Sequence, residues 1–312
     1  MFTKNFKQLS YKDVGEADGK GASLGEMSGA KLPVPPGFVV LAKAFDQFLR
    51  ETDLEVEVAA ILKKVNYKDI NSVDKASNVI RDLIHDQPMP NDIKKEILTE
   101  FKKLKAKFVA VRSSATAEDS SVASWAGELE TYLDTIEKNL LDNIRKCWSS
   151  LFTPRAIFYR QEKEMLKTKV SVAVVIQEMI ASEISGIVFT VHPVTKNKNQ
   201  LIIEAGWGLG EAIVSGQVTP DAYVINKRDL SILDINIAKQ DMMIVRKPGG
   251  GVKHAAVAKA KREKQKLSGK QIIELAKICA QIEKHYKQPQ DIEWAMAKGK
   301  IYITQSRPIT TL

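Results

Sequence analysis

The spacing of hydrophobic residues divides the chain into a helical first third and a strand-rich remainder. Apolar residues that recur every three or four positions are typical of amphipathic helices. This spacing predicts helices at residues 42–52, 54–65, 92–105, 137–152 and 271–286. Between the third and fourth of these, the short apolar run FVAV at residues 108–111 ends on Arg112, which predicts a buried strand that leads into a polar loop.

After residue 170 the pattern changes to short apolar or alternating runs. These runs predict strands at residues 171–180, 186–191, 201–205, 222–226 and 242–246. The chain then shows a hairpin, with one strand at residues 291–296, a turn at 298–300 and a second strand from residue 301. Few strands alternate with helices, so the pattern favours an α+β fold over a doubly wound parallel sheet.

Length and composition place the chain among ordinary globular proteins. It has 312 residues, enough for about two domains, with 44% hydrophobic and 27% charged residues. No apolar run approaches the roughly 20 residues of a membrane-spanning helix, and the first residues do not form a secretory signal. Cys147 and Cys279 are too few for a disulfide framework or a cysteine metal site. A cytoplasmic location is therefore expected.

The net charge of +9 comes mostly from lysine, with 37 lysines and 10 arginines. Nucleic-acid readers rely on the planar arginine fork and on aromatic side chains that stack on bases. The most basic segment, residues 253–270, contains no aromatic residue, so nucleic-acid binding is not expected. The four histidines lie far apart in the sequence and show no metal-ligand spacing, so no zinc site is predicted.

Two glycine clusters resemble nucleotide-binding loops without matching them. The first, GEADGKGASLG at residues 15–25, has one residue too few before its Gly-Lys pair for a Walker loop, and Gly21 replaces the Ser or Thr that holds magnesium. Its backbone and Lys20 could still approach a phosphate, although a plain helix-entry loop explains the glycines equally. The second, GWGLGE at residues 206–211, lacks the third glycine of a dinucleotide fingerprint, which argues against that function.

Arg112 begins a run of hydroxyl residues, RSSATAEDSS, at the end of the predicted buried strand. A turn explains the hydroxyls, but a charge at the mouth of a buried strand calls for an anion or a carboxylate beside it. The next segment, SWAGELETY at residues 124–132, has two interpretations: a flap that pivots on Gly127, or an ordinary exposed loop.

The terminal hairpin places Asp291 and Glu293 on one face of its first strand, and Gln305 and Arg307 on one face of its second. A three-residue loop at 298–300 would pair 293 with 305 and 291 with 307, whereas a two-residue loop would send the pairs to opposite faces. In the first register, two carboxylates, an amide oxygen and a guanidinium meet, which suits a magnesium ion that bridges phosphate oxygens. A surface ion pair between Asp291 and Arg307 explains the same spacing.

Taken together, these motifs resemble the N-terminal ATP-binding domain of the phosphoenolpyruvate synthase (pyruvate, water dikinase) family, which is related to pyruvate phosphate dikinase and rifampin phosphotransferase. The matching segments are GKGASLGEM (19–27), VPPGF (34–38), VRSSATAED (111–119), AGELET (126–131), EM (178–179), SGIVFT (185–190), EAGWGLGE (204–211), VSG (214–216), DIEW (291–294) and QSRPIT (305–310). They follow the family's order over nearly the whole chain.

The resemblance implies an ATP-grasp fold, in which two lobes clamp the nucleotide. The lobes are expected at residues 1–195, with the phosphate loop and flap, and 196–312, with the metal-binding hairpin. It also implies site residues, namely Lys20 and Arg112 for the ATP phosphates, Gly127 and Thr131 in the flap, Gln177, Glu178 and Met179 for the base and sugar, Glu293, Gln305 and Asp291 for Mg²⁺, and Arg307 for the transferred group. Lys20, Arg112 and Arg307 would be the catalytic residues.

In the family, a swivelling domain carries a histidine that takes a pyrophosphoryl group from ATP, and a barrel domain passes phosphate to pyruvate. Both are absent from this chain, so it is expected to bind and activate Mg-ATP without making phosphoenolpyruvate alone. The segment GGGVKHAA at 249–256 echoes the phosphohistidine motif, but Val252 and Lys253 replace its threonine and small residue, so His254 is not expected to carry phosphate. The alternatives are an ATP domain of the rifampin phosphotransferase type, or a non-catalytic module that binds nucleotides or nucleic acid.

Overall fold

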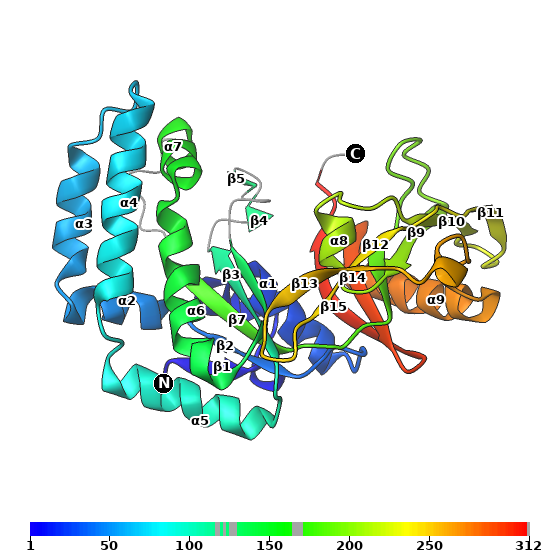
Figure 1. Ribbon diagram of the computed structural model, residues 1–312, viewed down its shortest axis with the longest axis horizontal. Coiled ribbons are helices and arrows are strands. Elements are labelled where there is room, and N and C mark those ends of the chain that lie inside the picture. The colour runs from blue at the N-terminus through cyan, green and yellow to red at the C-terminus, as the bar shows by residue number, and fades with distance from the viewer. Residues whose placement is uncertain (116–118, 121–122, 125–129, 164–170, 311–312) are drawn as a thin grey trace. The chain divides into compact units, whose positions relative to one another are not determined.

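The computed structural model describes residues 1–115, 119–120, 123–124, 130–163 and 171–310 (Figure 1). The chain forms two compact units: the first is Met1–Gly29 with Pro36–Met179, and the second is Ala30–Pro35 with Ile180–Leu312. Both units combine helices with antiparallel strands, which confirms the α+β class. The division expected after residue 195 falls between β8 (Ile184–Phe189) and β9 (Gln200–Trp207), inside the second unit.

A five-stranded antiparallel sheet forms the centre of the first unit. Its order is β1 (Thr3–Asn5), β2 (Gly37–Val40), β7 (Val172–Glu178), β3 (Val109–Ala115) and β6 (Thr131–Thr135). Alternate strand residues such as Phe38, Val111 and Ile176 enter one hydrophobic core with the helices that follow β2. These helices are α2 (Ala42–Glu51), α3 (Leu54–Lys63), α4 (Ile70–Asp86), α5 (Asn91–Leu104), α6 (Glu137–Ser149) and α7 (Pro154–Glu162).

The other face of this sheet is covered by α1 (Val14–Gly29), which contacts β3 and β7. Gly21 of α1 lies against Val39 of β2. Phe38 and Val40, on either side of Val39, point into the hydrophobic core, so Val39 points to the opposite face of the sheet. A Cβ atom at Gly21 would lie 2.9 Å from a methyl group of Val39, so the glycine allows the helix to approach the strand closely. The face covered by α1 is therefore distinct from the face that meets the hydrophobic core.

A six-stranded antiparallel sheet forms the second unit. Its order is β11 (Ile232–Asn236), β10 (Asp221–Asn226), β9, β8, β14 (Gln290–Ala297) and β15 (Lys300–Pro308). The helix α9 (Gly269–Tyr286) packs on one face of this sheet (Figure 1). Its buried residues are Ile272, Leu275, Ala276, Cys279 and Ile282. A separate ribbon of β12 (Met242–Arg246) and β13 (Val252–Ala256) belongs to the same unit. No helix in the described part of the chain is both long and apolar enough to cross a membrane.

The five predicted helices are confirmed as α2, α3, α5, α6 and α9, with the end of the fourth forming a 3₁₀ turn at Ser150–Phe152. The sequence pattern did not identify α4, although Asp69 caps its first turn by accepting from the N–H of Asn71. Many polar residues interrupt the apolar positions of α4, which is why its helical spacing is hard to recognise. Its buried face includes Val73, Ile80 and Ile84.

A buried ion pair holds together three segments of the second unit. Asp221 of β10 accepts a hydrogen bond from Nζ of Lys266 at 2.7 Å, and both side chains are 0% exposed. The carboxylate also accepts from the backbone N–H groups of Ala238 and Lys266 and from the hydroxyl of Tyr223. Every oxygen of the buried carboxylate thus has partners, as a charge removed from water requires.

We expect the stability of the first unit to fall in mild acid because of His85. Its Nε2 lies 3.0 Å from Oγ of Ser149, and burial, aided by the charge of Arg81, lowers the pKa of His85 from its ordinary value of about 6.5. The unfolded chain then binds a proton more readily than the folded chain does. The contribution of this histidine is complete above pH 6.5 and is lost progressively as the pH falls below that value.

Urea unfolding of the wild type and His85→Gln at pH 7.5 and pH 5.5 measures this effect. The wild type should lose more stability between the two pH values than the variant does. Equal losses in the two proteins would show that His85 does not produce the acid sensitivity.

Candidate functional site

Lys20 projects from α1 toward the strand β3. The backbone of Asp18, with φ 60° and ψ 174°, interrupts α1, so that Lys20 stands in the first turn of a new helical segment. Nζ of Lys20 donates a hydrogen bond to the carbonyl oxygen of Ser113 at 3.1 Å. The start of a helical segment and an ammonium group both favour an anion, so this corner of the sheet is suited to phosphate.

Residues 15–25, for which a phosphate loop and a plain helix-entry loop were both considered, lie within α1, which is interrupted at Asp18. Packing explains two of the glycines there, Gly21 against Val39 and Gly25 against Leu9. A Cβ atom at Gly25 would lie 2.8 Å from the carbonyl oxygen of Leu9, which is closer than real side chains approach. The glycines serve the close packing of the helix, and the candidate phosphate ligand of this segment is the Lys20 side chain.

Arg112 and Thr131 lie on the face of the sheet that α1 covers. They stand directly opposite each other on β3 and β6, and Arg112 also stands opposite Val175 of β7. Val175 is in turn opposite Val39, the residue that contacts α1 at Gly21. Because residues directly opposite in a sheet share a face, the structure brings Arg112 and Thr131 to the same side as Lys20.

Gln177 joins this face, since it follows Val175 by two residues on β7. Its side chain is 2% exposed, and its Nε2 has no hydrogen-bond partner among the described residues. A buried donor without a partner is costly, so this amide is available to an acceptor on a ligand. Glu178 and Met179 are half-buried and are the last two residues of the first unit. The N–H of Met179 donates a hydrogen bond to the carbonyl oxygen of Phe108. Gly127 and most of the predicted flap lie outside the described residues.

Of the two registers considered for the terminal hairpin, the structure has the one with Glu293 opposite Gln305 and Asp291 opposite Arg307. The three-residue loop expected to go with this register is not found: the turn contains only Lys298 and Gly299, both with positive φ, as in a type I′ turn. A β-bulge in β15 nevertheless brings Gln305 opposite Glu293.

The bulge places one extra residue, Thr304, in β15. Glu293 is opposite Gln305, while the next residue of β14, Trp294, is opposite Ile303. An extra residue reverses the alternation of the faces, and this compensates for the shorter turn. Bulges of this kind often lie beside functional sites, where they redirect a side chain.

Deleting Thr304 is expected to remove the bulge without changing the pairing of the hairpin. The residues after position 304 would move back by one place, so Gln305 would stay opposite Glu293 and Arg307 opposite Asp291 in a regular hairpin. Titration of Mn²⁺ in the presence of ATP, followed by electron paramagnetic resonance, should therefore show nearly wild-type binding, as it should for Thr304→Ser, which keeps the bulge. A loss of about tenfold or more in the deletion variant alone would show that the local twist of the bulge, and not the pairing, orients these side chains.

A further acid, Glu204, lies in line with Glu293 across the second sheet, and the sequence pattern predicted no role for it. Glu204 of β9 and Glu293 of β14 both stand opposite Ile187 of the intervening strand, so the two carboxylates face the same side about 10 Å apart at the backbone. Burial, together with the charge of Asp291, raises the pKa of Glu204. The available signal was a single acid within the otherwise apolar strand LIIEA.

Asp291 and Arg307 form a short ion pair, with Nη2 of Arg307 2.7 Å from the carboxylate. Burial raises the pKa of Asp291, and the arginine opposes that shift. Beside this pair, Gln305 is 7% exposed, and its Oε1 has no hydrogen-bond partner among the described residues. The alternative of a simple ion pair accounts for Asp291 and Arg307 but leaves this buried amide oxygen without a partner.

The row Glu293–Gln305 therefore offers oxygen ligands of the kind that Mg²⁺ prefers. Among the described residues, no group of three His, Cys, Asp or Glu side chains is placed to hold a metal by itself. A magnesium ion here would need further oxygens from phosphate and water, which is its usual coordination in kinases and ATPases. The residues present fit an ion that arrives with a nucleotide.

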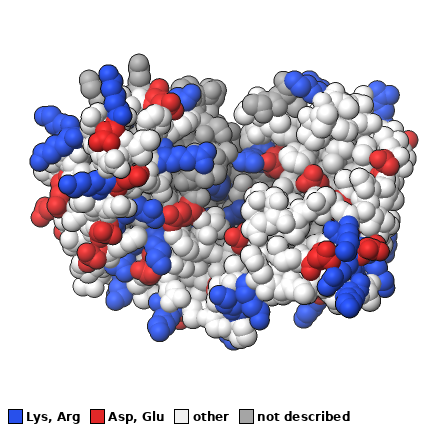
Figure 2. Space-filling view, turned by 45° about the horizontal axis from the view of Figure 1, so that its top comes forward, with Lys and Arg blue, Asp and Glu red and all other residues white. Residues whose placement is uncertain are grey.

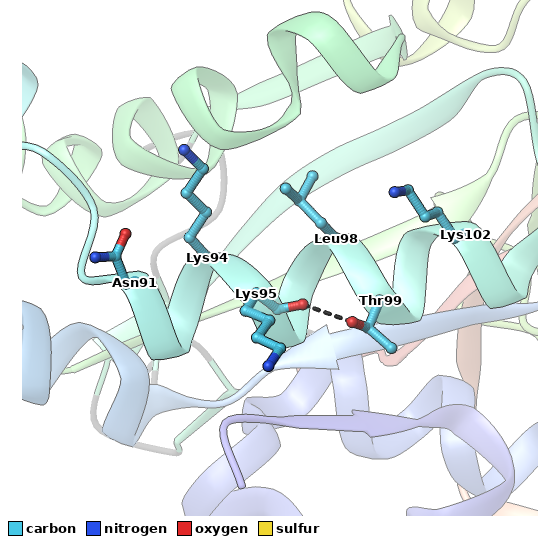
Figure 3. Close-up of a pocket in the computed structure, with 6 residues that line it drawn as sticks. All are labelled: Asn91, Lys94, Lys95, Leu98, Thr99 and Lys102. Atoms are coloured by element: carbon cyan, nitrogen blue, oxygen red, sulfur yellow. Dashed lines mark hydrogen bonds between the residues drawn. The ribbon is translucent and has the colours of Figure 1, made fainter.

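Two other features do not belong to this site. A cavity of about 430 Å³ lies along α5, lined by Asn91, Lys94, Lys95, Leu98, Thr99 and Lys102 (Figure 3). The inner side of α5 packs in the hydrophobic core, on the face of the sheet opposite Lys20. The second glycine cluster has a packing function, because a Cβ atom at Gly208, where φ is +90°, would lie 2.6 Å from the carbonyl oxygen of Ile244.

Comparison with known proteins agrees with this geometry. Residues 14–312 match the family described as pyruvate phosphate dikinase, AMP/ATP-binding domain. The chain belongs to this family. The resemblance inferred from its motifs is confirmed, and the chain is an ATP-binding domain of the kind found in phosphoenolpyruvate synthases and related phosphotransferases.

Several curated relatives align over nearly the whole chain. A probable phosphoenolpyruvate synthase of Methanocaldococcus jannaschii is 48% identical over 98% of this chain and 26% of that protein. The phosphoenolpyruvate synthase of Pyrococcus furiosus is 42% identical over 100% of the chain and 44% of that protein. The rifampicin phosphotransferase of Bacillus subtilis is 40% identical over 94% of the chain and 34% of that protein. The chain thus spans less than half the length of these relatives.

Proposed function

We propose that this domain binds Mg-ATP and activates it for phosphoryl or pyrophosphoryl transfer to a histidine on a separate domain or subunit. The observation that carries the proposal is the pairing of Glu293 with Gln305, which lie opposite each other on β14 and β15. The buried amide oxygen of Gln305 has no hydrogen-bond partner among the described residues, and the ion pair of Asp291 and Arg307 lies beside it. Phosphoryl transfer leaves little covalent chemistry to the protein, so catalysis depends on positioned charges of this kind.

In this proposal the two units are the lobes of an ATP-grasp fold, and both contribute to one nucleotide site. Lys20, which reaches β3 from α1, and Arg112 would hold the phosphates. Thr131, opposite Arg112 on the same face of the sheet, would lie beside them at the end of the flap. Gln177 would donate its buried Nε2–H to an acceptor of the base, and Glu178 and Met179 would meet the base and sugar. Gly127, as part of the flap, would cover the phosphates.

On the second sheet, Glu293 and Gln305 would bind Mg²⁺ directly, and Asp291 would complete the site. The ion would neutralise charge on the phosphate oxygens. Arg307, held in place by Asp291, would stabilise charge on the group in transfer. Glu204 is too far from Gln305 to share a close coordination sphere and would act by adding negative charge to the same face.

The complete reaction would convert pyruvate to phosphoenolpyruvate, with AMP and phosphate as the other products. It would require the histidine-bearing swivelling domain and the pyruvate-binding barrel domain, and we expect it to take place in the cytoplasm. This reaction is supported by the names of the archaeal relatives, which match this chain over less than half their own length.

A second candidate function is activation of ATP for an antibiotic kinase. The match to the Bacillus subtilis rifampicin phosphotransferase favours it, at an identity close to that of the Pyrococcus furiosus relative. The acceptor is recognised by other domains, so the two functions differ in the partner and share the site described above.

A nucleic-acid-binding module is less well supported. Figure 2 shows lysine and arginine side chains interspersed with aspartate and glutamate on the face in view, without a continuous basic stripe. The groove along α5 has three lysines but neither arginine nor an aromatic residue among its lining residues. Base stacking and bidentate phosphate contacts are therefore missing from this groove.

Isothermal titration calorimetry with Mg-ATP tests the proposed function. We expect binding in the micromolar to millimolar range that is typical of enzyme substrates, and weaker binding when EDTA removes the metal. Purified AMP should compete, because it shares the base and sugar. No detectable heat of binding at millimolar Mg-ATP would refute the proposal.

A further inference from the structure

Glu130 is held from two sides just before β6 begins. Oε1 of its carboxylate lies 2.7 Å from Nη2 of Arg81, which projects from α4. The other oxygen accepts a hydrogen bond from the hydroxyl of Tyr132. Burial, and then the hydrogen bond to Glu130, raises the pKa of Tyr132, so the phenol stays protonated and remains a donor. The carboxylate is about one-quarter exposed, with a side-chain exposure of 27%.

The backbone of Glu130 continues this chain of contacts toward Lys20. Its carbonyl oxygen accepts from the N–H of Ser113 at 3.1 Å and from Oγ of Ser113 at 2.8 Å. The carbonyl oxygen of Ser113 then accepts from Nζ of Lys20 at 3.1 Å. The backbone of Glu130, whose carboxylate Arg81 and Tyr132 hold, is thus linked through Ser113 to the ammonium group of Lys20.

The same residue adjoins two further candidate site residues of the first unit. Thr131 follows Glu130 directly and stands opposite Arg112. Among the described strands, β6 lies at the edge of the sheet beside β3, so the position of its first residues depends on contacts of this kind as well as on the ladder. The clamp of Arg81 and Tyr132 on Glu130 supplies those contacts.

We infer that Glu130 is a positioning residue, which sets Lys20, Arg112 and Thr131 for the triphosphate of ATP without touching the nucleotide. The inference rests on the proposed function. Holding charged ligands in one geometry before the substrate arrives removes the cost of ordering them during binding, and small displacements of such groups are expensive. Arg81 and Tyr132 share this role through their contacts with the Glu130 carboxylate.

Glu130→Gln tests the inference, because it keeps the shape of the side chain and removes its charge. The affinity for Mg-ATP should fall roughly tenfold to a hundredfold. The affinity for adenosine, measured by saturation-transfer NMR at millimolar concentration, should stay unchanged because adenosine has no phosphate. Glu137→Gln, which changes an exposed glutamate at the start of α6, is the matched control and should change neither affinity.

Combination with Lys20→Ala separates this inference from the proposed function. Lys20→Ala alone should weaken Mg-ATP binding, and adding Glu130→Gln should then cost clearly less than it does in the wild type, since coupled residues are not additive. If Lys20→Ala binds Mg-ATP normally, the proposed site itself is wrong. If Lys20→Ala weakens binding but Glu130→Gln does not, or weakens ATP and adenosine equally, the role of Glu130 is refuted. Should Glu130→Gln fail to fold, Tyr132→Phe and Arg81→Met give the same comparison through the other side of the clamp.

Discussion

Glu293→Ala is expected to abolish transfer of phosphate from Mg-ATP to an added histidine domain, with a loss of at least about 10²–10³-fold in rate. Glu293 supplies the carboxylate directly opposite Gln305, and without it the hairpin would keep only the amide oxygen and the ion-paired Asp291 from the proposed metal site. The fold should persist, because Glu293 is half-buried on the face of β14 away from α9 and its neighbours Ile292 and Trp294 provide the core contacts. Rapid-quench measurement with radiolabelled ATP gives the rate, and thermal unfolding checks the fold.

Glu274→Ala, which removes an exposed glutamate from α9, is the matched control for this variant and should transfer phosphate at the wild-type rate. Arg307→Ala should lose about as much as Glu293→Ala or more, as the loss of an arginine that stabilises a transferred phosphoryl group costs roughly 10³-fold or more. Normal transfer by Glu293→Ala would remove the metal-binding role assigned to the hairpin.

Asp221→Ala is expected to destabilise the second unit by about 3–5 kcal/mol, the range for breaking a buried ion pair by removing one partner. The ammonium group of Lys266 would remain at 0% exposure with only the carbonyl oxygen of Ala238 as a partner that the structure records. The Tyr223 hydroxyl would lose its acceptor as well. Urea unfolding measures the change as a shift in midpoint.

The double variant Asp221→Ala, Lys266→Met provides the control for Asp221→Ala. Removing both charges should restore part of the lost stability, because no unpaired charge remains buried. A destabilisation below about 1 kcal/mol in Asp221→Ala, within the usual range of surface substitutions, would show that the pair contributes little.

The hairpin shows how much of the site the sequence could predict. Alternation placed Asp291 with Glu293 and Gln305 with Arg307, and these placements are confirmed. The reason for their pairing was wrong, because a shorter turn and the bulge at Thr304 compensate for each other. A bulge has no strong sequence signal, whereas its effect on register is as large as that of a whole residue in the turn.

Other features depended on packing that a single sequence does not display. The glycines around Lys20 looked like a loop because glycine is permissive, yet Gly21 and Gly25 allow α1 to approach its neighbours. Glu204 reaches the same face as Glu293 only through the order of three strands, which joins β9 and β14 across β8. Strand order is set by contacts between distant segments, so local spacing could not reveal this acid.

We propose that side chains of both units bind one nucleotide and its metal. A crystal structure of the domain with Mg²⁺ and a non-hydrolysable ATP analogue tests it most directly. Our proposal predicts a metal ion bound by Glu293 and Gln305 and by phosphate oxygens of the same triphosphate that contacts Lys20 and Arg112. A triphosphate that contacts Lys20 and Arg112 while the metal and the hairpin side chains lie elsewhere would contradict it.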